Sequence, residues 1–241
     1  MITHQSLGKH GRLGNQIFQY SFLFGLSELK GYDFCIPTET DLERCFNLTC
    51  KLQPLTLSKG FVEKHFHYDP NFQSYSDNTN YTGYFQTEKY FEHCKQKLID
   101  SLRFREEHKK PITFCDPSDL VSIHIRRGDY VGNKHHPVIS IEYIQQAKLK
   151  FNNKQFLVFS DDINWCKSNN LGNYYSENNS HYTDLYWMTL CNGSIISNSS
   201  FSWWGAYLSK KTKIIAPKHW FSGNNTRHST QDLYCKDWIL L

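Results

Sequence analysis

The second half of the chain alternates apolar stretches of strand length with segments of helical character, and this alternation limits the fold more than any other feature. The apolar stretches lie at residues 121–126, 156–159, 194–197 and 213–217. Strands joined by helical crossovers form a parallel sheet that is covered on both faces. We therefore predict an α/β fold. Its helices are expected after Ser140, which is placed to cap one, and over residues 163–169, 184–190 and 201–208.

The N-terminal part of the chain has the outline of a nucleotide-binding half-unit. A predicted strand at 2–7 leads into a loop, residues 8–14, with glycine at every third position, so its backbone can approach a ligand closely. A buried helix over 17–30 follows, with Gly31 as its cap, and then a strand at 32–36. The start of that helix is a candidate anion site. The glycine spacing is neither the dinucleotide fingerprint nor the P-loop.

The middle of the chain carries weaker patterns. Its predicted elements are strands at 61–68 and 84–86 and an amphipathic helix at 88–99. A polar break near residue 110 separates this region from the alternating half. We therefore divide the chain into an N-terminal lobe, residues 1–115, and a C-terminal lobe, residues 116–241.

Composition and charge argue against several classes of function. A formal net charge of +4 over 241 residues permits a local basic site but does not predict the broad basic face of a nucleic-acid-binding protein. No apolar run approaches the roughly 20 residues of a membrane span. The N-terminus lacks the charged and apolar parts of a signal peptide. We therefore expect a cytoplasmic protein with no membrane span and no nucleic-acid partner.

Polar side chains follow the predicted strands at four places. These clusters lie at residues 8–15, 126–129, 160–162 and 198–200. In parallel α/β sheets, ligands bind beyond the carboxyl ends of the strands. We therefore expect the clusters to contribute to one ligand site, the first from one α/β unit and the other three from a second unit across a cleft.

Two adjacent arginines, Arg126 and Arg127, indicate the chemistry of this site. Planar guanidinium forks donate to phosphates or carboxylates, and two in succession suit a dianion or a diphosphate. Hydroxyls and free backbone N–H groups at the helix start near Ser199 and Ser200 can converge on phosphate oxygens. Taken alone, the arginine pair is also compatible with a solvated strand end in which Arg127 contacts Asp129.

Carboxylates near the same strand ends extend this interpretation. Asp161, Asp162 and Asp184 are acceptors that suit ribose hydroxyls or the N–H groups of guanine. Together with the arginines, they describe a site for a nucleoside diphosphate that carries a further group.

Four segments of the chain stand out as motifs: GRLGNQIFQY at 11–20, HIRRGDY at 124–130, FSDD at 159–162 and SNSSFSWWGA at 197–206. In order and at similar intervals, they resemble the motif set of the α-1,2-fucosyltransferases, glycosyltransferase family 11. The match runs from near the N-terminus to about residue 217, and residues 38–110 carry little of it. The wider kinship includes the α-1,6- and protein O-fucosyltransferases, which share the His-x-Arg-Arg element.

The resemblance implies a GT-B fold, in which two Rossmann-like lobes face each other across a cleft. It implies inverting transfer of L-fucose from GDP-β-L-fucose to the 2-hydroxyl of a galactose-terminated oligosaccharide, in an α-1,2 linkage. It also implies that the reaction uses no metal ion and no cofactor besides the donor. The C-terminal lobe would bind GDP-fucose, and the N-terminal lobe would lie on the acceptor side.

The resemblance further implies roles for single residues. Arg126 would hold the diphosphate and balance the leaving GDP, Arg127 would support it, and His124 would contact the nucleoside. Asp184 would accept from guanine, and Asn15 would touch the diphosphate or the incoming acceptor. The other residues expected at the donor site are Arg12, Ser160, Asp161, Ser199, Ser200 and Phe201.

A catalytic base is harder to assign. Related α-1,6 enzymes carry a glutamate shortly after the arginine pair, whereas residues 130–136 of this chain hold no carboxylate. Asp129 is the nearest acid, and His135 and His136 are further candidates. Asp129 is alternatively a brace for Arg127. A late, dissociative transition state needs little help from a base, so no residue has to fill this role.

Three alternatives stay open. The first is fucosyl transfer with another linkage, such as α-1,6. The second is a non-catalytic glycan-binding module, suggested by the aromatic content of 16%, although the arginine and serine pairs argue against it. The third concerns Trp203 and Trp204, which are candidates either for stacking on the acceptor sugar or, as a pair on a buried helix, for the core.

Overall fold

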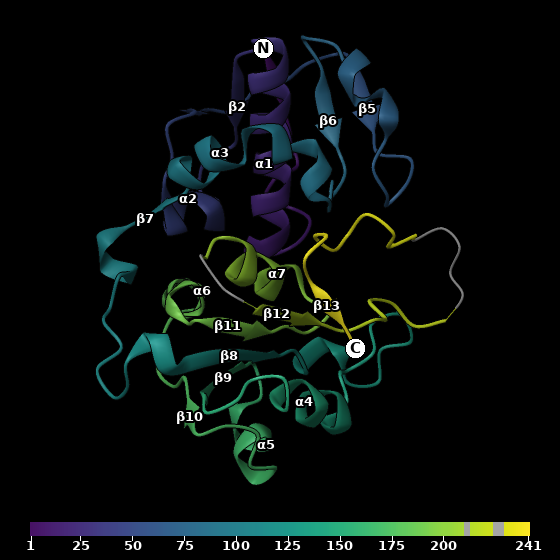
Figure 1. Ribbon diagram of the computed structural model, residues 1–241. Helices are drawn as coiled ribbons and strands as arrows, with labels where there is room; N and C mark the ends of the chain where they lie inside the picture. Colours follow the sequence, from purple (N-terminus) through teal and green to yellow (C-terminus); the bar gives the residue numbers. More distant parts are fainter. Residues whose placement is uncertain (210–212, 224–228) are drawn as a thin grey trace. The chain divides into compact units, whose positions relative to one another are not determined.

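A computed structural model describes residues 1–209, 213–223 and 229–241 (Figure 1). Over these residues the chain forms two compact units. The N-terminal unit holds residues 1–105 together with 229–235, and the C-terminal unit holds the described residues from 106 to 223 together with 236–241. The first unit therefore ends at Arg105, where the sequence suggested residue 115, and it includes a segment from near the C-terminus.

The C-terminal unit is built on a six-stranded sheet whose paired strands all run parallel. Its strands are β8 (Leu120–Ile125), β9 (Gln155–Ser160), β10 (Tyr174–Tyr175), β11 (Gly193–Ile195), β12 (Lys213–Ala216) and β13 (Ile239–Leu240). They lie side by side in the order β10-β9-β8-β11-β12-β13. Counted along this unit, that order is third, second, first, fourth, fifth, sixth, which is the strand order of doubly wound nucleotide-binding sheets.

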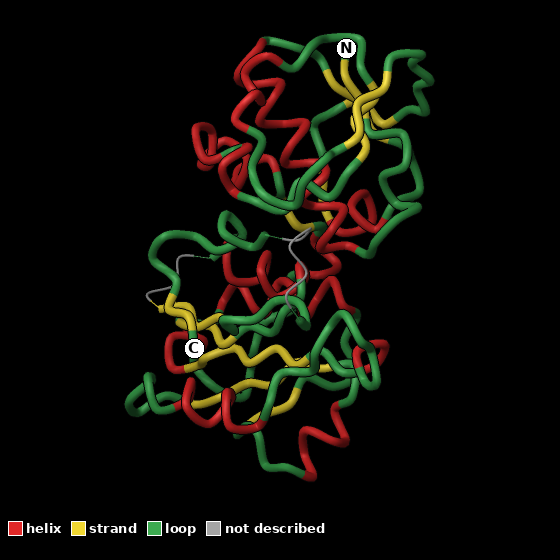
Figure 2. Tube along the Cα trace, turned by 90° about the vertical axis from the view of Figure 1, so that its right-hand side faces the viewer, coloured by secondary structure: helices red, strands yellow, loops and turns green. Residues whose placement is uncertain are grey.

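Helices occupy the crossovers and cover both faces of this sheet. They are α4 (Ile141–Lys148), α5 (Ile163–Ser168), α6 (His181–Leu190) and α7 (Ser200–Tyr207). The predicted cap is confirmed, because the Ser140 hydroxyl accepts a hydrogen bond from the backbone N–H of Tyr143. Figure 2 shows the strands in yellow with the helices in red beside them.

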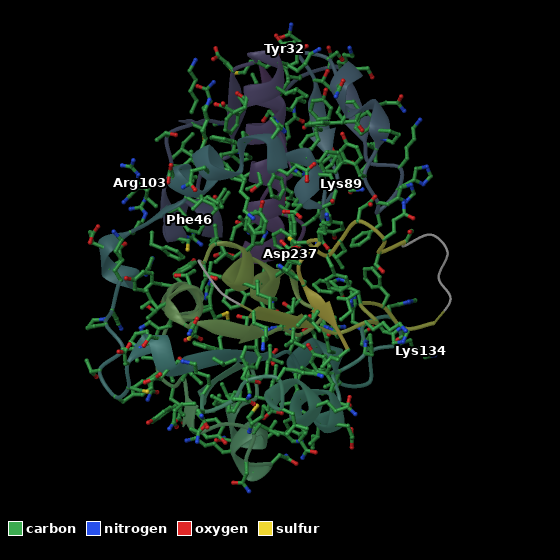
Figure 3. All side chains as sticks on the ribbon, in the orientation of Figure 1. Tyr32, Phe46, Lys89, Arg103, Lys134 and Asp237 are labelled. Carbon is green, nitrogen blue, oxygen red and sulfur yellow. The ribbon has the colours of Figure 1, made fainter. Side chains whose placement is uncertain are left out.

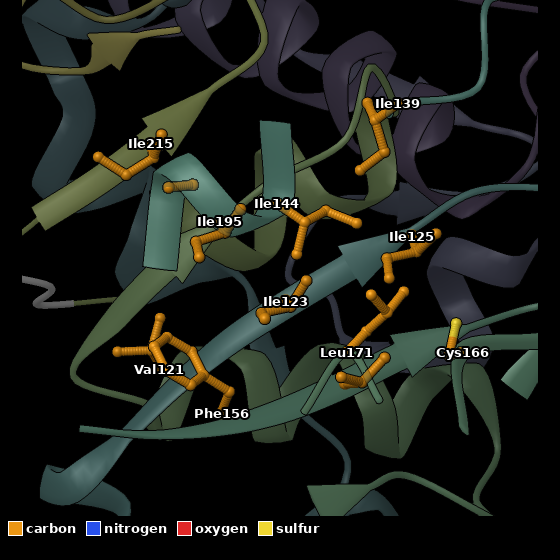
Figure 4. Packing of buried hydrophobic residues seen from close by; sticks show 12 residues of the cluster. Val121, Ile123, Ile125, Ile139, Ile144, Phe156, Cys166, Leu171, Ile195 and Ile215 are labelled. Carbon is orange, nitrogen blue, oxygen red and sulfur yellow. The ribbon is translucent and has the colours of Figure 1, made fainter. Parts of the chain in front are cut away.

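Two apolar clusters fill the space between the sheet and its helices. On one face Val121, Ile123 and Ile125 of β8 pack with side chains of α4 and α5 (Figure 4). On the other face Leu120 and Leu157 pack with residues of α6. Each fully buried aliphatic side chain of this kind stabilises the fold by about 1.5–3 kcal/mol. Strands buried on both faces explain why the sequence shows continuous apolar stretches here.

The polar side chains of β8 are buried as well. All six residues of the strand are buried. The Ser122 hydroxyl lies 2.5 Å from the Ser194 hydroxyl on β11, so it pairs within the sheet layer. The alternating polar face of this strand therefore packs inside the protein.

The N-terminal unit has a second parallel sheet. Its strands, in spatial order, are β4 (Lys51–Leu52), β2 (Phe34–Ile36), β1 (Ile2–Thr3), β6 (Asn80–Thr82) and β5 (Gly60–Val62). The long helix α1 (Leu13–Lys30) is buried along most of its length, and Gly31 ends it in a left-handed conformation with φ of 71°. The predicted order of strand, glycine loop, helix and strand is confirmed, but the strand expected at 2–7 is limited to β1 and the helix expected from residue 17 begins at Leu13.

The rest of the N-terminal unit consists of short elements. They are α2 (Asp41–Cys45), β3 (Phe46–Asn47), η1 (Pro70–Ser74), η2 (Glu88–Tyr90), η3 (Glu92–Cys94), α3 (Lys95–Ser101) and β7 (Arg103–Phe104). Phe46 and Arg103, labelled in Figure 3, lie on β3 and β7, which pair antiparallel. Lys89 forms a 2.6 Å ion pair with Asp232 and so ties residues 229–235 to this unit.

Three predictions for the middle of the chain are wrong in detail. The strand expected at 61–68 is limited to β5, and the residues expected as a strand at 84–86 lie in no regular element. The helix expected at 88–99 is divided into two 3-10 turns followed by α3.

No described helix of either unit is long and apolar enough to cross a bilayer.

Candidate functional site

The polar clusters of the C-terminal unit meet at the point where the strand order reverses. The chain leaves β8 toward β9 on one side, and β11 pairs with β8 on the other side. The loops after these three strands therefore leave the same edge of the sheet. In doubly wound sheets this reversal point is where ligands bind. The site consists of the residues that follow these strands and those of α7.

Arg126 stands at the end of β8 and is held by two carboxylates. Its Nη1 lies 2.7 Å from Oδ2 of Asp161, and its Nη2 donates to Oδ1 of Asp129. The guanidinium also lies over the ring of Tyr130, 5.7 Å from the ring centre. Its side chain keeps 16% of its surface exposed, so the fork is fixed in direction while remaining open on one side.

Arg127 points to a different set of partners. Its Nε donates to Oδ2 of Asp162 at 3.0 Å, and its guanidinium stacks on Trp165 at 3.8 Å from the ring centre. Asp162 in turn caps α5 by accepting from the backbone N–H of Trp165. The hydrogen bond from Arg127 lowers the pKa of Asp162. The two arginines therefore do not form one paired fork, and Arg127 braces the start of α5.

The local ion pairs also differ from those expected. Asp129 pairs with Arg126 and not with Arg127, because the short 3-10 turn η6 (Gly128–Tyr130) brings residues 126 and 129 together. Asp161 uses both oxygens on the protein itself: Oδ1 accepts from the backbone N–H of Arg127 at 2.8 Å, and Oδ2 pairs with Arg126. Asp161 therefore organises the loop after β8.

Ser160 and Gly128 support the same arrangement. The Ser160 hydroxyl accepts from the backbone N–H of Asp162 at 3.0 Å, which fixes the turn after β9. At Gly128 the Asp161 carboxylate packs so closely that a Cβ would lie 2.6 Å from its Oδ2. The glycine in the Arg-Arg-Gly-Asp loop is therefore required for this close approach.

Replacement of Gly128 by alanine is expected to destabilise the C-terminal unit by about 1–3 kcal/mol, the usual cost of forcing an extra methyl group into a packed site. The methyl group would displace the Asp161 carboxylate from Arg126 and from the backbone of Arg127. Denaturant unfolding of the two proteins measures the change. Gly60→Ala is the comparison variant, because a Cβ there meets no neighbour within 4 Å and the backbone of Gly60 is not left-handed. Equal stability of Gly128→Ala and wild type would show that the loop has room for a side chain.

His124 is buried beside the arginine and is neutral near pH 7. Its Nδ1 lies 2.8 Å from the Ser197 hydroxyl, and its ring contacts that of Phe201 at 5.4 Å between centres. Burial lowers the pKa of His124 to about 4, and the Arg126 charge acts in the same direction while Asp161 opposes it. His124 therefore adds no positive charge to the site and links β8 to α7.

Asn198 anchors the start of α7. In the sequence it was only part of the polar cluster at 198–200, with no role of its own. Its Nδ2 donates to the carbonyl groups of Pro137 and Trp220, at 2.9 and 3.0 Å. The backbone carbonyl of Asn198 accepts from the Tyr130 hydroxyl at 3.1 Å. Ser199 then precedes the first residue of α7 with no side-chain capping hydrogen bond. The loop after β11 is thereby fixed to the loop after β8.

The remaining candidates of this unit occupy separate places. Asp184 lies in the first turn of α6 and accepts from the Ser176 hydroxyl at 2.5 Å. Burial raises its pKa to about 6, with the Ser176 hydrogen bond acting in the opposite direction. His136 stacks on Tyr130 at 4.9 Å between ring centres, and the backbone N–H groups of His135 and His136 both donate to the Asn133 side chain.

The tryptophan pair belongs to the core. Trp203 and Trp204 are both completely buried. Trp203 stacks on Tyr207 at 4.7 Å and contacts Trp238 at 5.3 Å between ring centres. The core interpretation of this pair is confirmed, and stacking on an acceptor sugar is excluded for this conformation.

Asn15 and Arg12 belong to the N-terminal unit. Arg12 is exposed and immediately precedes α1. Asn15 lies in the first turn of α1, and its Oδ1 accepts from the side-chain amide of Gln86 at 2.8 Å. Gly11 has φ of +90°, and a Cβ there would lie 2.3 Å from Nδ2 of Asn15. The glycine loop therefore allows the Asn15 side chain to lie against it.

Two residues near Asn15 were not singled out from the sequence. Gln86 is the hydrogen-bond partner just described, and Glu63 accepts from the backbone N–H groups of Tyr84 and Phe85 at 2.7 and 3.0 Å. Burial raises the pKa of Glu63 to about 7, while these two hydrogen bonds lower it. Nothing in the local sequence pattern indicated the contacts of either side chain.

Solved structures with a similar fold are fucosyltransferases. A structure of POFUT1 in complex with GDP-fucose aligns with a TM-score of 0.56 at 12% identity, covering 100% of this chain and 97% of that one. A structure of NodZ alpha-1,6-fucosyltransferase soaked with GDP-fucose aligns with a TM-score of 0.53 at 12% identity, covering 82% and 89%. At this identity the likeness establishes the fold, and the predicted α/β class with parallel sheets is confirmed.

Sequence relatives are glycosyltransferases. The chain is 38% identical over 150 residues to the O-antigen biosynthesis glycosyltransferase WbnK of Escherichia coli, covering 56% of this chain and 48% of that protein. It is 32% identical to an alpha-1,2-colitosyltransferase of Escherichia coli, covering 88% and 90%. It is 22% identical to the galactoside 2-alpha-L-fucosyltransferase SEC1 of Bos taurus, covering 97% and 73%.

The family match extends over nearly the whole chain, from residue 3 to residue 241, and so includes the middle region in which the sequence motifs are sparse. It agrees with the resemblance carried by the four motifs. The chain belongs to glycosyl transferase family 11.

Proposed function

We propose that the protein transfers L-fucose from GDP-β-L-fucose to the 2-hydroxyl of a galactose-terminated oligosaccharide, with inversion and without a metal ion. Relatives with α-1,2 specificity and structural neighbours that bind GDP-fucose support the donor and the linkage. The donor is assigned to the C-terminal unit and the acceptor to the N-terminal unit. The observation that carries the proposal is the Arg126 guanidinium, held in direction at the reversal point of a doubly wound sheet.

Arg126 supplies the charge that the leaving group requires. Departure of GDP leaves an oxocarbenium-like sugar and two phosphates of increasing negative charge. A guanidinium fork already fixed by Asp161 stabilises that charge without reorganising during the reaction. Asp129 is the more exposed of its two carboxylate partners, with 58% of its side-chain surface accessible. The diphosphate is expected to replace Asp129 on Arg126.

Release of Asp129 from Arg126 makes this carboxylate the leading candidate for the base. Asp129 would accept the proton of the acceptor hydroxyl as the new bond to the sugar forms. His136 is less suited to the role, because its ring packs against Tyr130 and Phe221.

A colitosyl donor is the second candidate. The 32% identical relative is an alpha-1,2-colitosyltransferase, and colitose is L-fucose without its 3-hydroxyl. A site that hydrogen-bonds the 3-hydroxyl would reject colitose by as much as about 10⁴–10⁵-fold, whereas an apolar pocket would discriminate weakly. The ratio of kcat/KM for GDP-fucose and GDP-colitose therefore decides between these donors.

A transfer assay tests the whole proposal. The protein is incubated with GDP-fucose and a panel of galactosides in the presence of a chelator, and the linkage of the product is read by NMR. We expect a Fucα1-2Gal product with undiminished rate when the chelator is present. A product linked at another position would support the α-1,6 alternative, and a rate that requires an added divalent ion would contradict the role of Arg126.

Calorimetry with GDP separates an enzyme from a glycan-binding module. A transferase should bind GDP at micromolar concentrations and lose that affinity when Arg126 is replaced. A module that recognises only glycans would show no heat with GDP and would bind the free oligosaccharide in the absence of nucleotide.

Asp184→Asn is expected to stabilise the protein near neutral pH while weakening GDP binding. The pKa of Asp184 is raised to about 6 from about 3.9 in an unfolded chain, so the folded state holds the proton more tightly. Stability linked to this group is therefore present below about pH 4, is lost as pH rises to about 6, and stays lost above it. Asparagine removes this cost, and each kcal/mol recovered should raise Tm by about 2–4 °C.

The measurement is the difference in Tm between the variant and wild type across this pH range. The exposed residue Asp237 of the same unit provides the matched control, Asp237→Asn. His124 affects stability in the opposite direction, because its lowered pKa makes stability fall as pH drops from about 6.5 to about 4. Both proteins contain His124, so its contribution cancels in the Tm difference between the variant and wild type. A Tm difference that is flat with pH, or unchanged GDP affinity, would contradict the assignment of Asp184.

A further inference from the structure

A turn in the N-terminal unit, residues 83–86, has a backbone conformation that needs support. Phe85 has φ of 52°, in the left-handed region that a bulky side chain rarely adopts. Its ring is completely buried and stacks on Phe22 at 3.7 Å between centres. Such conformations persist where the surrounding structure fixes them, and they are concentrated at functional sites.

Glu63 fixes the turn from one side. Its two carboxylate oxygens accept from the backbone N–H groups of Tyr84 and Phe85, at 2.7 and 3.0 Å. Gly83 permits this approach, since a Cβ there would lie 2.7 Å from Oε2 and 2.4 Å from Cβ of Glu63. One side chain from the end of β5 therefore satisfies two successive backbone donors.

His4 and Gln19 fix the turn from the other side. The carbonyl of Gly83 accepts from Nε2 of Gln19 at 3.1 Å, and Nε2 of His4 lies 2.9 Å from the same oxygen. Both side chains are buried, His4 after β1 and Gln19 on α1. Three elements of the unit thus converge on a turn that has no regular secondary structure.

Gln86 is the side chain that this support places. It is buried, and its Nε2 donates to Oδ1 of Asn15 at 2.8 Å. An amide nitrogen only donates, so the contact directs the oxygen of Asn15 toward Gln86. The nitrogen of Asn15 faces Gly11, where an added Cβ would lie 2.3 Å away. The orientation of the Asn15 amide is therefore set by Gln86.

We propose that Gln86 is a positioning residue for the transfer reaction, acting by holding Asn15 so that its NH₂ group is the edge presented to ligand. Phosphate and hydroxyl oxygens both accept hydrogen bonds, so the donor edge is the one that either ligand of Asn15 requires. The inference rests on the proposed function, in which Asn15 contacts the diphosphate or the acceptor. Glu63, His4 and Gln19 serve Gln86 by fixing the turn that carries it.

A double-mutant cycle tests this role. Gln86→Ala is expected to lower kcat/KM about tenfold in the wild-type background, the effect of one hydrogen bond. In the Asn15→Ala background the same change should alter kcat/KM by less than about twofold, because the residue through which Gln86 acts is absent. Separate KM values for donor and acceptor show which ligand Asn15 contacts.

Gln86→Glu distinguishes orientation from simple packing. Glutamate has nearly the same shape but only accepts when ionised, so Asn15 can pair with it only by turning its NH₂ group toward residue 86. The Asn15 oxygen would then face the ligand. We expect at least as large a loss of kcat/KM as for Gln86→Ala. If the alanine variant does not fold, this isosteric variant carries the test.

Gln96→Ala is the matched control, since Gln96 is an exposed glutamine of the same unit whose amide donates to Asp100 at 3.0 Å. It should change neither kcat nor KM. Absence of transfer by wild type would overturn the proposed function. With an active wild type, equal losses from Gln86→Ala in both backgrounds, or a Gln86→Glu variant as active as wild type, would overturn the role of Gln86.

Discussion

Arg126→Ala is expected to lower kcat on the order of 10²–10³-fold, the effect of removing a donor that acts on developing charge in the transition state. The loss has two sources in the structure. The guanidinium is removed from the reversal point of the sheet, and Asp129 and Asp161 are left without their cationic partner. In the variant the diphosphate would face the two carboxylates without the positive charge that balances them in wild type. GDP affinity should therefore fall together with kcat.

Arg126→Lys should restore little of this activity. Lysine keeps the charge, but its ammonium cannot form the two directed contacts that Nη1 and Nη2 make with Asp161 and Asp129. Single-turnover kinetics with GDP-fucose and GDP calorimetry measure the two effects separately. Arg44→Ala is the control for loss of a positive charge, because Arg44 is 61% exposed and belongs to the other unit.

Arg127→Ala provides a second comparison within the same loop. The stacking of Arg127 on Trp165 and its bond to Asp162 give it a bracing role at α5. Its loss should therefore lower stability more than it lowers kcat. A kcat for Arg126→Ala within a few-fold of wild type, or a larger catalytic loss for Arg127→Ala, would remove Arg126 from the centre of the mechanism.

The strands and helices that position this loop could be predicted from the sequence because their burial is continuous. β8, β9, β11 and β12 lie within one or two residues of the predicted bounds. Strands buried on both faces appear as uninterrupted apolar stretches. The end of α1 was likewise marked by Gly31, whose left-handed conformation few other residues adopt at low cost.

The short elements of the N-terminal unit could not be predicted in this way. β5 and β6 have three residues each, too few for an alternating pattern to emerge. Phe85 favours a strand by its side chain, yet its backbone is left-handed because Glu63 holds the adjacent N–H groups. A tertiary contact over more than twenty residues thus decided the local conformation.

The site shows the same division between local and distant information. The composition of the loop after β8 predicted an anion site, and this loop leaves the sheet at the strand-order reversal, where doubly wound sheets bind ligands. Which carboxylate pairs with which arginine could not be predicted, because Asp161 and Asp162 reach Arg126 and Arg127 from another strand. The hydrogen bond between Gln86 and Asn15 could not be predicted for the same reason, because the two residues are distant in the chain.

Trp203→Ala should cost about 3–5 kcal/mol of unfolding free energy, the range for removal of a large buried aromatic side chain. Trp203 is completely buried and contacts the rings of Trp204, Tyr207 and Trp238, so its removal leaves a cavity among large side chains. Denaturant unfolding measures the change. Trp187→Ala is the comparison variant, because Trp187 is partly exposed and should cost less.

Trp203→Phe separates a core role from a substrate role. Phenylalanine retains much of the apolar volume, so this variant should fold and lose less stability than the alanine variant. Trp203 lies on α7, the helix that follows Ser199. If Trp203 contributes only to the packing of this helix, the acceptor KM of Trp203→Phe should equal that of wild type. A raised acceptor KM with little loss of stability would instead place the indole in contact with sugar, and would mean that α7 moves when the acceptor binds.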